Sequence, residues 1–208
     1  MSYKVKVLFD GYSTINTEGL SANCSCVLIS GPKKVIVDTM SAWDRDRIVE
    51  ALTREGLTCD NVDFVVSTHG HSDHIGNNNL FLKAKHIVGF AVSFQDQYFI
   101  HPFETSEPYI IDDGVVVIPT PGHTLDHVSV LVRTSDLGTV VVAGDLFEKV
   151  EDLEDPSLWR LVAGSDNQEE QEKNRNKILL LADWIVPGHG PIFKVTENMK
   201  SNARQGLK

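Results

Sequence analysis

The feature that most constrains this chain is the segment THGHSDH, a dense cluster of metal-binding side chains. His69, His71, Asp73 and His74 lie within six positions, directly after an apolar run at residues 62–66. Imidazole and carboxylate groups are the ligands that Zn²⁺ accepts at sites where a coordination position stays open for water. The chain has only eight histidines in 208 residues, so chance does not explain a cluster of this density. The segment therefore predicts a fold in which a buried strand ends at a catalytic metal site.

Composition limits the partners of such a site. A hydrophobic content of 41% and a charged content of 23% are typical of a soluble globular protein. The net charge of −10 argues against a polynucleotide partner, because an acidic protein has no global attraction for nucleic acid. No stretch approaches the ~20 apolar residues that span a bilayer, so we expect no membrane partner. Three cysteines do not make a disulfide framework and the N-terminus does not resemble a signal peptide, so we expect Cys24 and Cys26 to be buried thiols in the cytoplasm or nucleus.

Hydrophobic periodicity predicts short strands in both halves of the chain, with a helix closing each half. The expected strands are residues 3–9, 25–30, 35–37, 62–67, 86–89, 115–118, 128–132, 139–143 and 184–186. The expected helices are residues 43–55 and 165–181, the second opening with capping-box chemistry. No linker rich in Gly, Ser or Pro divides the halves. We therefore expect one α/β domain over residues 1–208, with two sheets packed between helices.

Two other segments have simple interpretations. Phe90, Phe94 and Tyr98 follow one another at four-residue spacing, which predicts a helical stripe in the core, with a substrate wall or a dimer contact as the alternative. Whether residues 90–109 cover the active site stays open. Acidic residues dominate 148–155, and this composition predicts a solvated loop.

Three further candidate ligands share one trait, because each follows an apolar strand at a turn that contains glycine. They are His123 in PGHT, Asp145 in AGD and His189 in PGHG. Glycine lets the backbone turn tightly and approach a ligand closely. Strand ends are rigid, which suits side chains that must be held in a fixed geometry. We therefore expect these three side chains to aim into the same pocket as the first cluster.

Counting ligands predicts two metal ions that share one carboxylate. The expected sets are His69, His71 and His123 for the first ion, Asp73, His74 and His189 for the second, and Asp145 as the bridge between them. Two Zn²⁺ ions leave such a site with residual positive charge, which would attract an anionic substrate despite the acidic surface. Asp73 is the expected catalytic residue, orienting a water molecule and taking its proton.

Two residues are expected to support these ligands. Asp38 directly follows the strand at 35–37, just as the candidate ligands follow their strands. We expect its carboxylate to accept a hydrogen bond from a ligand histidine and so fix the orientation of that histidine ring. His127 lies four residues beyond His123, and the sequence leaves open whether it supports the site or only the core.

The ordered motifs resemble those of the metallo-β-lactamase superfamily over essentially the whole chain. They are Val37-Asp38-Thr39, the spacing His69-x-His71-x-Asp73-His74, then His123, Asp145 and His189. This resemblance implies a four-layer αββα sandwich of two similar halves, with the metals at one edge of the sheets. It also implies the branch that holds glyoxalase II and the metal-dependent nucleases, because β-lactamases of the commonest type carry a cysteine at the position of Asp145.

Within that branch the chain resembles a group associated with zinc-dependent endonucleolytic cleavage of histone pre-mRNA at its 3′ end. The likeness lies in residues 68–77 and 123–130 and in the length of the chain. It implies an endoribonuclease that is a homodimer and is found in cytoplasm and nucleus. The chain departs from its larger relatives, since it has no room for an inserted RNA clamp and only about twenty residues after His189, where glutathione thioesterases carry a helical region.

Three enzyme hypotheses follow from these observations. The first is a dinuclear zinc phosphodiesterase that acts on RNA. The alternative is a thioesterase or lactonase of the glyoxalase II type, acting on a small anionic ester or thioester. A third is an iron dioxygenase of persulfides, which uses the same fold with a single iron and fewer ligands. A binding module without catalysis is disfavoured, because seven intact ligands would then have no role.

Overall fold

The apolar runs of the first half form a seven-stranded sheet in the computed structural model, which describes residues 2–207. The strand order is β1–β4–β5–β6–β7–β8–β9. The bounds are β1 Lys4–Phe9, β4 Cys26–Ser30, β5 Lys34–Val37, β6 Phe64–Ser67, β7 Lys85–Val88, β8 Ala91–Phe94 and β9 Gln97–Phe99. Strands β5, β6 and β7 run parallel to one another, and the other pairs in this sheet are antiparallel.

The second half forms a six-stranded sheet in the order β10–β11–β12–β13–β14–β15. The bounds are β10 Tyr109–Asp112, β11 Val115–Pro119, β12 Val128–Arg133, β13 Thr139–Gly144, β14 Trp184–Pro187 and β15 Phe193–Lys194. Strands β11 and β13 are both antiparallel to β12, and β14 is parallel to β13. Strands β11, β13 and β14 therefore run in the same direction and end at the same edge of the sheet.

Valines pack between the two sheets and make the central core. Val35 and Val37 of β5 face Val140 and Val142 of β13 across this core, and all four are fully or almost fully buried. Intervening residues such as Ile36 turn to the outer face, where they are buried as well. Strands buried on both faces appear in a sequence as continuous apolar runs, which is why the runs could be recognised.

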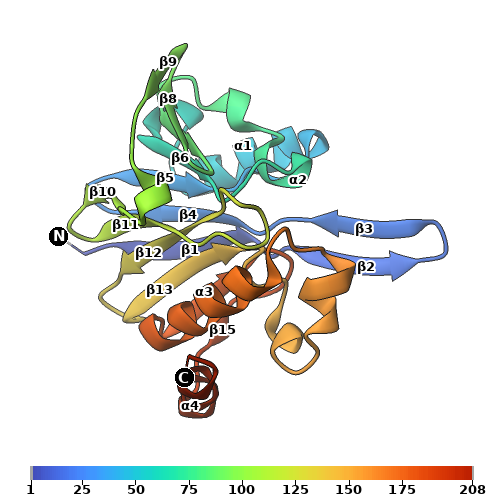
Figure 1. The fold of residues 1–208 in the computed structure, drawn as a ribbon. Coiled ribbons are helices and arrows are strands. Elements are labelled where there is room, and N and C mark those ends of the chain that lie inside the picture. The colour runs from blue at the N-terminus through green and yellow to red at the C-terminus, as the bar shows by residue number, and fades with distance from the viewer. Residues whose placement is uncertain (1, 208) are drawn as a thin grey trace.

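Helices cover the two outer faces and complete four layers (Figure 1). Helix α1 (Arg45–Arg54) packs on the outer face of the first sheet, and α3 (Gln168–Leu181) packs on the outer face of the second. Helix α4 (Glu197–Gly206) lies against α3. No helix within the described residues is long and apolar enough to cross a membrane.

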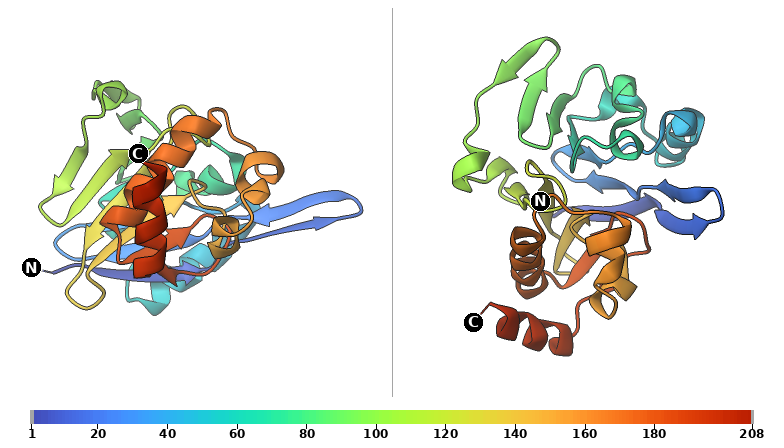
Figure 2. Two further views of the ribbon diagram at one scale, coloured as in Figure 1. Left: turned by 60° about the horizontal axis from the view of Figure 1, so that its bottom comes forward. Right: turned by 45° about the vertical axis from the view of Figure 1, so that its right-hand side comes forward.

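One element leaves the sandwich altogether. Strands β2 (Tyr12–Asn16) and β3 (Gly19–Asn23) form a separate antiparallel hairpin. The hairpin projects away from the body of the molecule in all three ribbon views (Figures 1 and 2). Ile15 and Leu20 on this hairpin are more than half exposed. The side chains at the tip of this hairpin therefore lie outside the central core.

The αββα architecture predicted from the sequence is confirmed. Most expected strands form within one or two residues of their predicted bounds, and the first helix ends just before Gly56, which has a left-handed φ of 71°. Helix α3 begins later than predicted, with Asn167 as the capping residue. The assignment of residues 1–208 to a single domain stays a prediction, and its end residues Met1 and Lys208 lie outside the described residues.

Two predictions for irregular segments are wrong. Phe94 and Tyr98 do not form a helical stripe, because β8 and β9 pair as a hairpin around Gln95, which has a left-handed φ of 55°. A four-residue spacing of aromatic residues also fits two strands joined by a tight turn, and strand pairing decided between them. The acidic segment is not simply solvated, since Glu148 and Asp152 are buried and a short helical turn, η5 (Val150–Leu153), forms there.

Candidate metal centre

The first four candidate ligands come from the loop and single helical turn that follow β6. His71 is the residue that precedes the short helix α2 (Ser72–Ile75), and this turn carries Asp73 and His74. His69 and His74 are buried, whereas His71 is exposed and the side chain of Asp73 is 22% exposed. The loop therefore presents buried ligands and solvent-facing ligands side by side.

The other three candidates come from the strand ends of the second sheet. His123 follows β11, Asp145 follows β13 and His189 follows β14, and all three are buried. Gly144 has a left-handed φ of 51°, and a side chain there would collide with Thr68 from the first half. Glycine at this position lets the two halves approach closely enough for their ligands to meet.

One group of donor atoms converges as the sequence predicted for the first metal. Nε2 of His69 lies 2.9 Å from Nδ1 of His71, which lies 3.2 Å from Nε2 of His123. The rings of these histidines are nearly perpendicular to one another, at 80–88°. Oδ2 of Asp145 lies 3.4 Å from Nε2 of His123 and 3.7 Å from Nε2 of His69. Ligand nitrogens around a tetrahedral Zn²⁺ lie about 3.3 Å apart, so this spacing fits one cation.

A second group gathers on the other side of Asp145. Oδ1 of Asp145 lies 3.2 Å from Nε2 of His74, and Oδ2 lies 3.2 Å from Nε2 of His189. Oδ2 of Asp73 lies 3.9 Å from the first of these nitrogens and 3.8 Å from the second. The carboxylate of Asp145 thus faces both groups, which is the position that a bridging ligand requires.

Unpaired buried atoms show that this arrangement has room for a cation among its donor atoms. Within residues 2–207, Nε2 of His74 and Oδ1 of Asp145 are buried and have no hydrogen-bond partner. Buried polar atoms in folded proteins are nearly always paired, and an unpaired one is costly. A divalent cation between these groups would satisfy both atoms. The number and identity of the metals stay predictions.

The outer ring nitrogens of three histidines are held in a common way. Nδ1 of His74 donates to Oδ2 of Asp38 at 3.0 Å, that of His123 to the carbonyl of Gly164 at 3.0 Å, and that of His189 to the carbonyl of Asn23 at 3.0 Å. When the ring is neutral, each hydrogen bond places the proton on Nδ1 and leaves the lone pair of Nε2 available to a metal ion. This pattern is typical of metal-binding histidines.

Asp38 occupies a strained backbone position at the end of β5. Its φ is 57°, in the left-handed region that few residues other than glycine adopt. One carboxylate oxygen accepts a hydrogen bond from the backbone N–H of Thr68 at 2.7 Å, and the other faces His74. These two contacts offset the strain, and they hold the loop after β6 and the ring of His74 in place. The contact with His74 has the form that the sequence analysis expected.

The electrostatics of the group follow from burial and from one shared carboxylate. Burial alone would lower the pKa of His189, but the nearby carboxylate of Asp145 raises it to about 9. Burial would raise the pKa of Asp145, but His189 and His74 hold it well below its usual range. Burial lowers the pKa of His69 and of His123. These shifts favour an ionised Asp145 and neutral rings at His69 and His123, which are the forms that bind metals.

His127 touches the group without joining it. Its ring stacks on that of His69 at a centroid distance of 5.4 Å, and its Nδ1 lies 3.0 Å from the hydroxyl of Thr120. Burial lowers the pKa of His127 to about 3, so the ring is neutral. It makes no hydrogen bond to a candidate ligand within the described part of the chain. A supporting role through packing stays a prediction.

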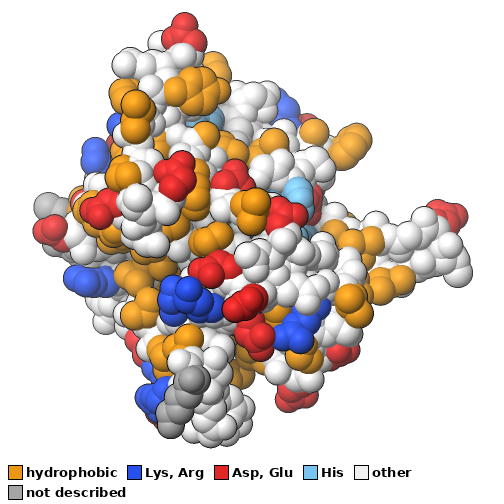
Figure 3. Space-filling view, in the orientation of Figure 1, with side chains coloured by type: hydrophobic (Ala, Val, Ile, Leu, Met, Phe, Trp, Pro, Cys, Tyr) orange, Lys and Arg blue, Asp and Glu red, His pale blue; other side chains and the backbone are white. Residues whose placement is uncertain are grey.

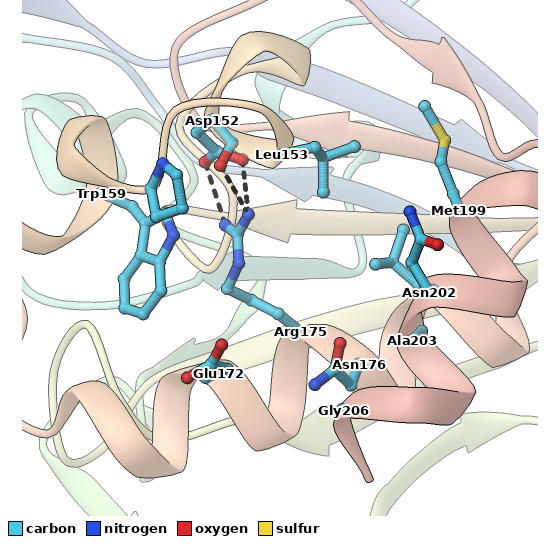
Figure 4. Close-up of a pocket in the computed structure, with 12 residues that line it drawn as sticks. Asp152, Leu153, Trp159, Glu172, Arg175, Asn176, Met199, Asn202, Ala203 and Gly206 are labelled. Atoms are coloured by element: carbon cyan, nitrogen blue, oxygen red, sulfur yellow. Dashed lines mark hydrogen bonds and ion pairs between the residues drawn. The ribbon is translucent and has the colours of Figure 1, made fainter.

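Helix α3 clamps the loop that carries Asp145 and extends to Asp152, where Figure 4 shows the ion pair with Arg175. Gln171 donates to the carbonyl of Asp145 at 3.1 Å. Arg175 donates to the carbonyl of Leu146 at 2.8 Å and to both carboxylate oxygens of Asp152 at 2.6 and 3.0 Å. These buried contacts fix the backbone of the loop at both of its ends.

Sequence analysis missed one acidic residue at the centre. Glu148 is buried, and one of its carboxylate oxygens lies within 4.8 Å of ligand atoms of Asp145 and His189. Burial and the neighbouring Asp145 raise the pKa of Glu148 to about 8. The available signal was its position three residues after Asp145, but the surrounding acidic run disguised it. In Figure 3 an exposed part of a histidine side chain lies next to acidic side chains on the face shown.

Comparison with known proteins agrees with this geometry. The family model described as the metallo-beta-lactamase superfamily matches residues 21–189. A Xenopus laevis protein named metallo-beta-lactamase domain-containing protein 1 is 42% identical over 199 residues, covering 94% of this chain and 83% of that protein. The chain spans 65%, 68% and 64% of the mouse, rat and human proteins of that name. These matches confirm the resemblance to the metallo-β-lactamase superfamily that the sequence motifs indicated.

Lactone-hydrolysing proteins are also similar. An N-acyl homoserine lactonase of Bacillus thuringiensis is 32% identical over 123 residues, which cover 54% of this chain and 49% of the lactonase. A solved structure of an N-acyl homoserine lactone hydrolase, with its product at the catalytic metal centre, matches with a TM-score of 0.62 and 20% identity. The match covers 96% of this chain and 95% of that one. At this identity the likeness is one of fold alone.

Proposed function

The chain belongs to the metallo-β-lactamase superfamily, and on that premise we propose that it is a hydrolase that uses two zinc ions. Family membership supports a metal-dependent hydrolase. The observation that carries the finer proposal is the carboxylate of Asp145, which faces two convergent sets of ligands and has a buried unpaired oxygen. A carboxylate placed in this way suits two cations better than one.

The chemistry divides between the metals and the side chains around them. Zinc ions held here would supply a water of lowered pKa and would polarise the group under attack. Asp73 is the partly exposed member of the second group, so its carboxylate can orient that water and hold its proton. His71 lies at the open side of the first group. The solvent-facing side chains thus mark the direction from which substrate enters.

The substrate that we propose is a small carboxylic ester, lactone or thioester. The sequence likeness to an N-acyl homoserine lactonase, at 32% identity over about half of the chain, supports this bond type. The net charge of −10 opposes a polyanion. A centre in which five of the seven candidate ligands are buried suits a small substrate.

Cleavage of RNA is the second candidate. It rests on the resemblance described above and on the pairing of two ligand sets around Asp145, an arrangement that also suits in-line displacement at phosphorus. The same resemblance implies a homodimer in cytoplasm and nucleus, and these features belong to the proposal with it. Light scattering of the purified protein would test the dimer.

The test compares substrates on one zinc-loaded preparation. We expect γ-lactones and thioesters to be hydrolysed, and we expect Asp73→Ala and His123→Ala to reduce turnover by more than ~1000-fold, since each removes several kcal/mol of transition-state stabilisation. His101→Ala is the matched control, because His101 lies 3.1 Å from the carbonyl of Glu107 and makes no hydrogen bond to a candidate ligand among residues 2–207. Circular dichroism should show an unchanged fold in all three variants.

The outcomes separate the candidates. Single-stranded RNA cleaved by wild type and by neither variant would move the proposal to the second candidate. Metal analysis that finds one iron per chain would favour persulfide oxidation over hydrolysis. Turnover retained in Asp73→Ala or His123→Ala with full metal content would contradict the site itself.

A further inference from the structure

Residues 23–25 lead from the β2–β3 hairpin into β4, and they lie against the loop that carries His189. The N–H of Ser25 donates to the carbonyl of Gly188 at 2.7 Å. The carbonyl of Asn23 accepts from Nδ1 of His189 at 3.0 Å. Asn23 and Ser25 are both buried. A short segment of the first half thus holds a loop of the second half that contains a candidate metal ligand.

Glycine allows this close approach between the two halves. A side chain on Gly11, at the base of the hairpin, would collide with the carbonyl of Gly188. A side chain on Gly188 would in turn collide with Oδ1 of Asp145. The hydroxyl of Ser25 bridges the two backbones, because it accepts from the N–H of Gly11 at 2.9 Å and donates to the carbonyl of Gly190 at 3.3 Å. Backbone therefore packs directly on backbone here, so a displacement of one segment is passed to the other.

The ring of His189 depends on carbonyl groups of the first half. In the described structure its Nδ1 bonds to the carbonyls of Asn23 at 3.0 Å and Tyr12 at 3.2 Å. These two residues face each other as a pair at the base of the hairpin. No substitution removes a backbone carbonyl, so a side chain can influence this contact only by aiming the carbonyl.

The side chain of Asn23 has the contacts to do so. Its Oδ1 accepts from the N–H of Cys24 at 3.1 Å and from that of Ser41 at 3.1 Å. The N–H of Cys24 and the carbonyl of Asn23 belong to one planar peptide group. Holding the N–H therefore also sets the direction of the carbonyl, which meets the ring of His189.

The other end of the Asn23 amide is anchored at the start of helix α1. Its Nδ2 donates to Oδ2 of Asp44 at 2.6 Å. That carboxylate also accepts from the hydroxyl of Ser41 at 2.7 Å and pairs with Arg47. Asn23 and Asp44 are only 5% and 7% exposed, and a satisfied buried network of this kind is rigid. The carbonyl of Asn23 thus has a fixed support in the first half.

We propose that Asn23 is a positioning residue for the second metal ion, because its side chain aims the carbonyl that orients His189. The proposal rests on the two-metal hydrolase proposed above and deepens it. Asn23 contacts neither metal nor substrate in this role and acts through the ring of His189. Its loss should therefore weaken one ion, whereas loss of the shared carboxylate of Asp145 should release both.

Zinc binding tests this role without any substrate. Competition with a chromophoric chelator gives the affinities of the two ions, and anomalous diffraction at the zinc edge gives the occupancy of each position. Asn23→Ala should weaken the ion next to His189 by roughly 10- to 100-fold, the usual effect of losing an outer partner of a ligand. The ion held by His69, His71 and His123 should change by less than ~3-fold, since distant sites behave independently.

Asn78→Ala is the matched control. Asn78 also belongs to a hydrogen-bond network of the first half, through the hydroxyls of Thr39 and Ser67, but it bonds to no candidate ligand among the described residues. Urea denaturation of the metal-free variants measures the structural cost of each change. Asn78→Ala should leave both zinc affinities within ~3-fold of wild type. An equal fall of zinc affinity in the two variants would overturn the role of Asn23.

An exchange of side chains tests the hydrogen bonds themselves. Asn23→Asp alone places two carboxylates together and should weaken the ion next to His189. Adding Asp44→Asn restores one amide and one carboxylate with donor and acceptor exchanged, so the double variant should bind this ion within ~3-fold of wild type. A folded double variant as weak as Asn23→Ala would overturn the assignment.

A milder variant covers the case in which Asn23→Ala does not fold. Asn23→Ser keeps one short acceptor, so it should weaken the ion next to His189 by a smaller factor of ~3- to 10-fold. Unchanged affinity for this ion in folded Asn23→Ser would overturn the inference.

Failure of this inference can be separated from failure of the proposed function. Wild-type protein that binds two ions, with both unaffected or both equally weakened in Asn23→Ala, would overturn the role of Asn23 and leave the function intact. The expected loss of one ion, in a protein that hydrolyses none of the proposed substrates, would count against the proposed function alone. Wild-type protein that binds no ion next to His189 would overturn both.

Discussion

The two halves of this molecule supply the same kind of ligand in different ways. The first half delivers four candidate ligands from one loop and one helical turn after β6. The second half delivers three, each from a different strand end and separated by twenty residues or more. The ligands of the first half are set by local sequence, and those of the second half meet only because β11, β13 and β14 end at one edge.

The halves also differ in what holds their histidines. His74 of the first half is oriented by a side chain, the carboxylate of Asp38. His123 and His189 of the second half are oriented by backbone carbonyls, which no substitution at those residues removes. The first half is therefore sensitive to single changes around its ligands. The second half depends on the backbone, which the buried contacts of α3 hold in place.

The largest expected effect comes from the residue that joins the halves. Asp145→Ala should lose both zinc ions together and lower turnover by more than ~1000-fold, because both ligand groups share this carboxylate. Metal analysis after dialysis measures the loss. Asp136→Ala, an exposed aspartate of the same half, is the matched control and should keep both ions. Loss of a single ion from Asp145→Ala would break the bridging assignment.

The next effect should appear only in the second half. Arg175→Met breaks the buried ion pair with Asp152 and leaves a buried carboxylate unpaired, so the free energy of unfolding should fall by about 3–5 kcal/mol. Urea denaturation of the metal-free protein measures it. The double variant Arg175→Met with Asp152→Leu should recover much of this loss, since it leaves no unpaired charge. A single variant as stable as wild type would show that the clamp does not hold the loop.

A smaller effect should appear only in the first half. Asp38→Asn tolerates the left-handed φ of this position but weakens the acceptor that orients His74. Zinc affinity should fall by roughly 10- to 100-fold with the fold intact, as is usual when an outer partner of a ligand is lost. Asp63→Asn is the control, because Asp63 accepts a hydrogen bond from the backbone N–H of Lys34, pairs with Lys33 and contacts no candidate ligand among the described residues. Unchanged zinc affinity in Asp38→Asn would remove the contrast between the halves.

The smallest effect concerns a contact that ties the halves together far from the centre. The phenol of Tyr3 donates to Asp112 of the second half and accepts from the N–H of Lys33 in the first. Burial and the hydrogen bond to Asp112 raise the pKa of Tyr3 to about 12. Since the folded pKa lies above the unfolded value near 10, this stabilisation is complete below pH 10 and is lost as the pH rises toward 12.

Tyr3→Phe isolates that contribution. It should reduce the free energy of unfolding by about 1 kcal/mol at pH 8, the usual net value of one hydrogen bond. The difference from wild type should shrink above pH 10, as followed by urea denaturation across pH 8–11. A difference that stays constant over this range would show that the phenol contributes by packing and not through its proton.

The contrast between the halves explains what the sequence could predict. The THGHSDH segment was found because its ligands are neighbours in the chain, and Asp145 because a glycine turn followed a clear apolar strand. The αββα layering followed from valine-rich runs such as Val140–Val142, which are buried on both faces. These signals are local, and they need no knowledge of what packs against them.

Contacts between distant segments could not be read in the same way. The β2–β3 hairpin has few buried residues, so its periodicity gave no core signal. Glu148 was missed because its burial beside Asp145 and His189 depends on how the second half folds and not on its own neighbours in the sequence. The carbonyls of Gly164 and Asn23 leave no mark in side-chain chemistry at all. Tertiary structure alone brings these groups to the centre.

The most direct test of the account is the crystal structure of zinc-loaded protein with anomalous diffraction at the zinc edge. The account predicts two peaks roughly 3.5–4 Å apart, with the carboxylate of Asp145 between them. The first should be bound by His69, His71 and His123, and the second by Asp73, His74 and His189. A single fully occupied peak bound by ligands of one half alone would contradict the claim that the halves meet to form a dinuclear centre.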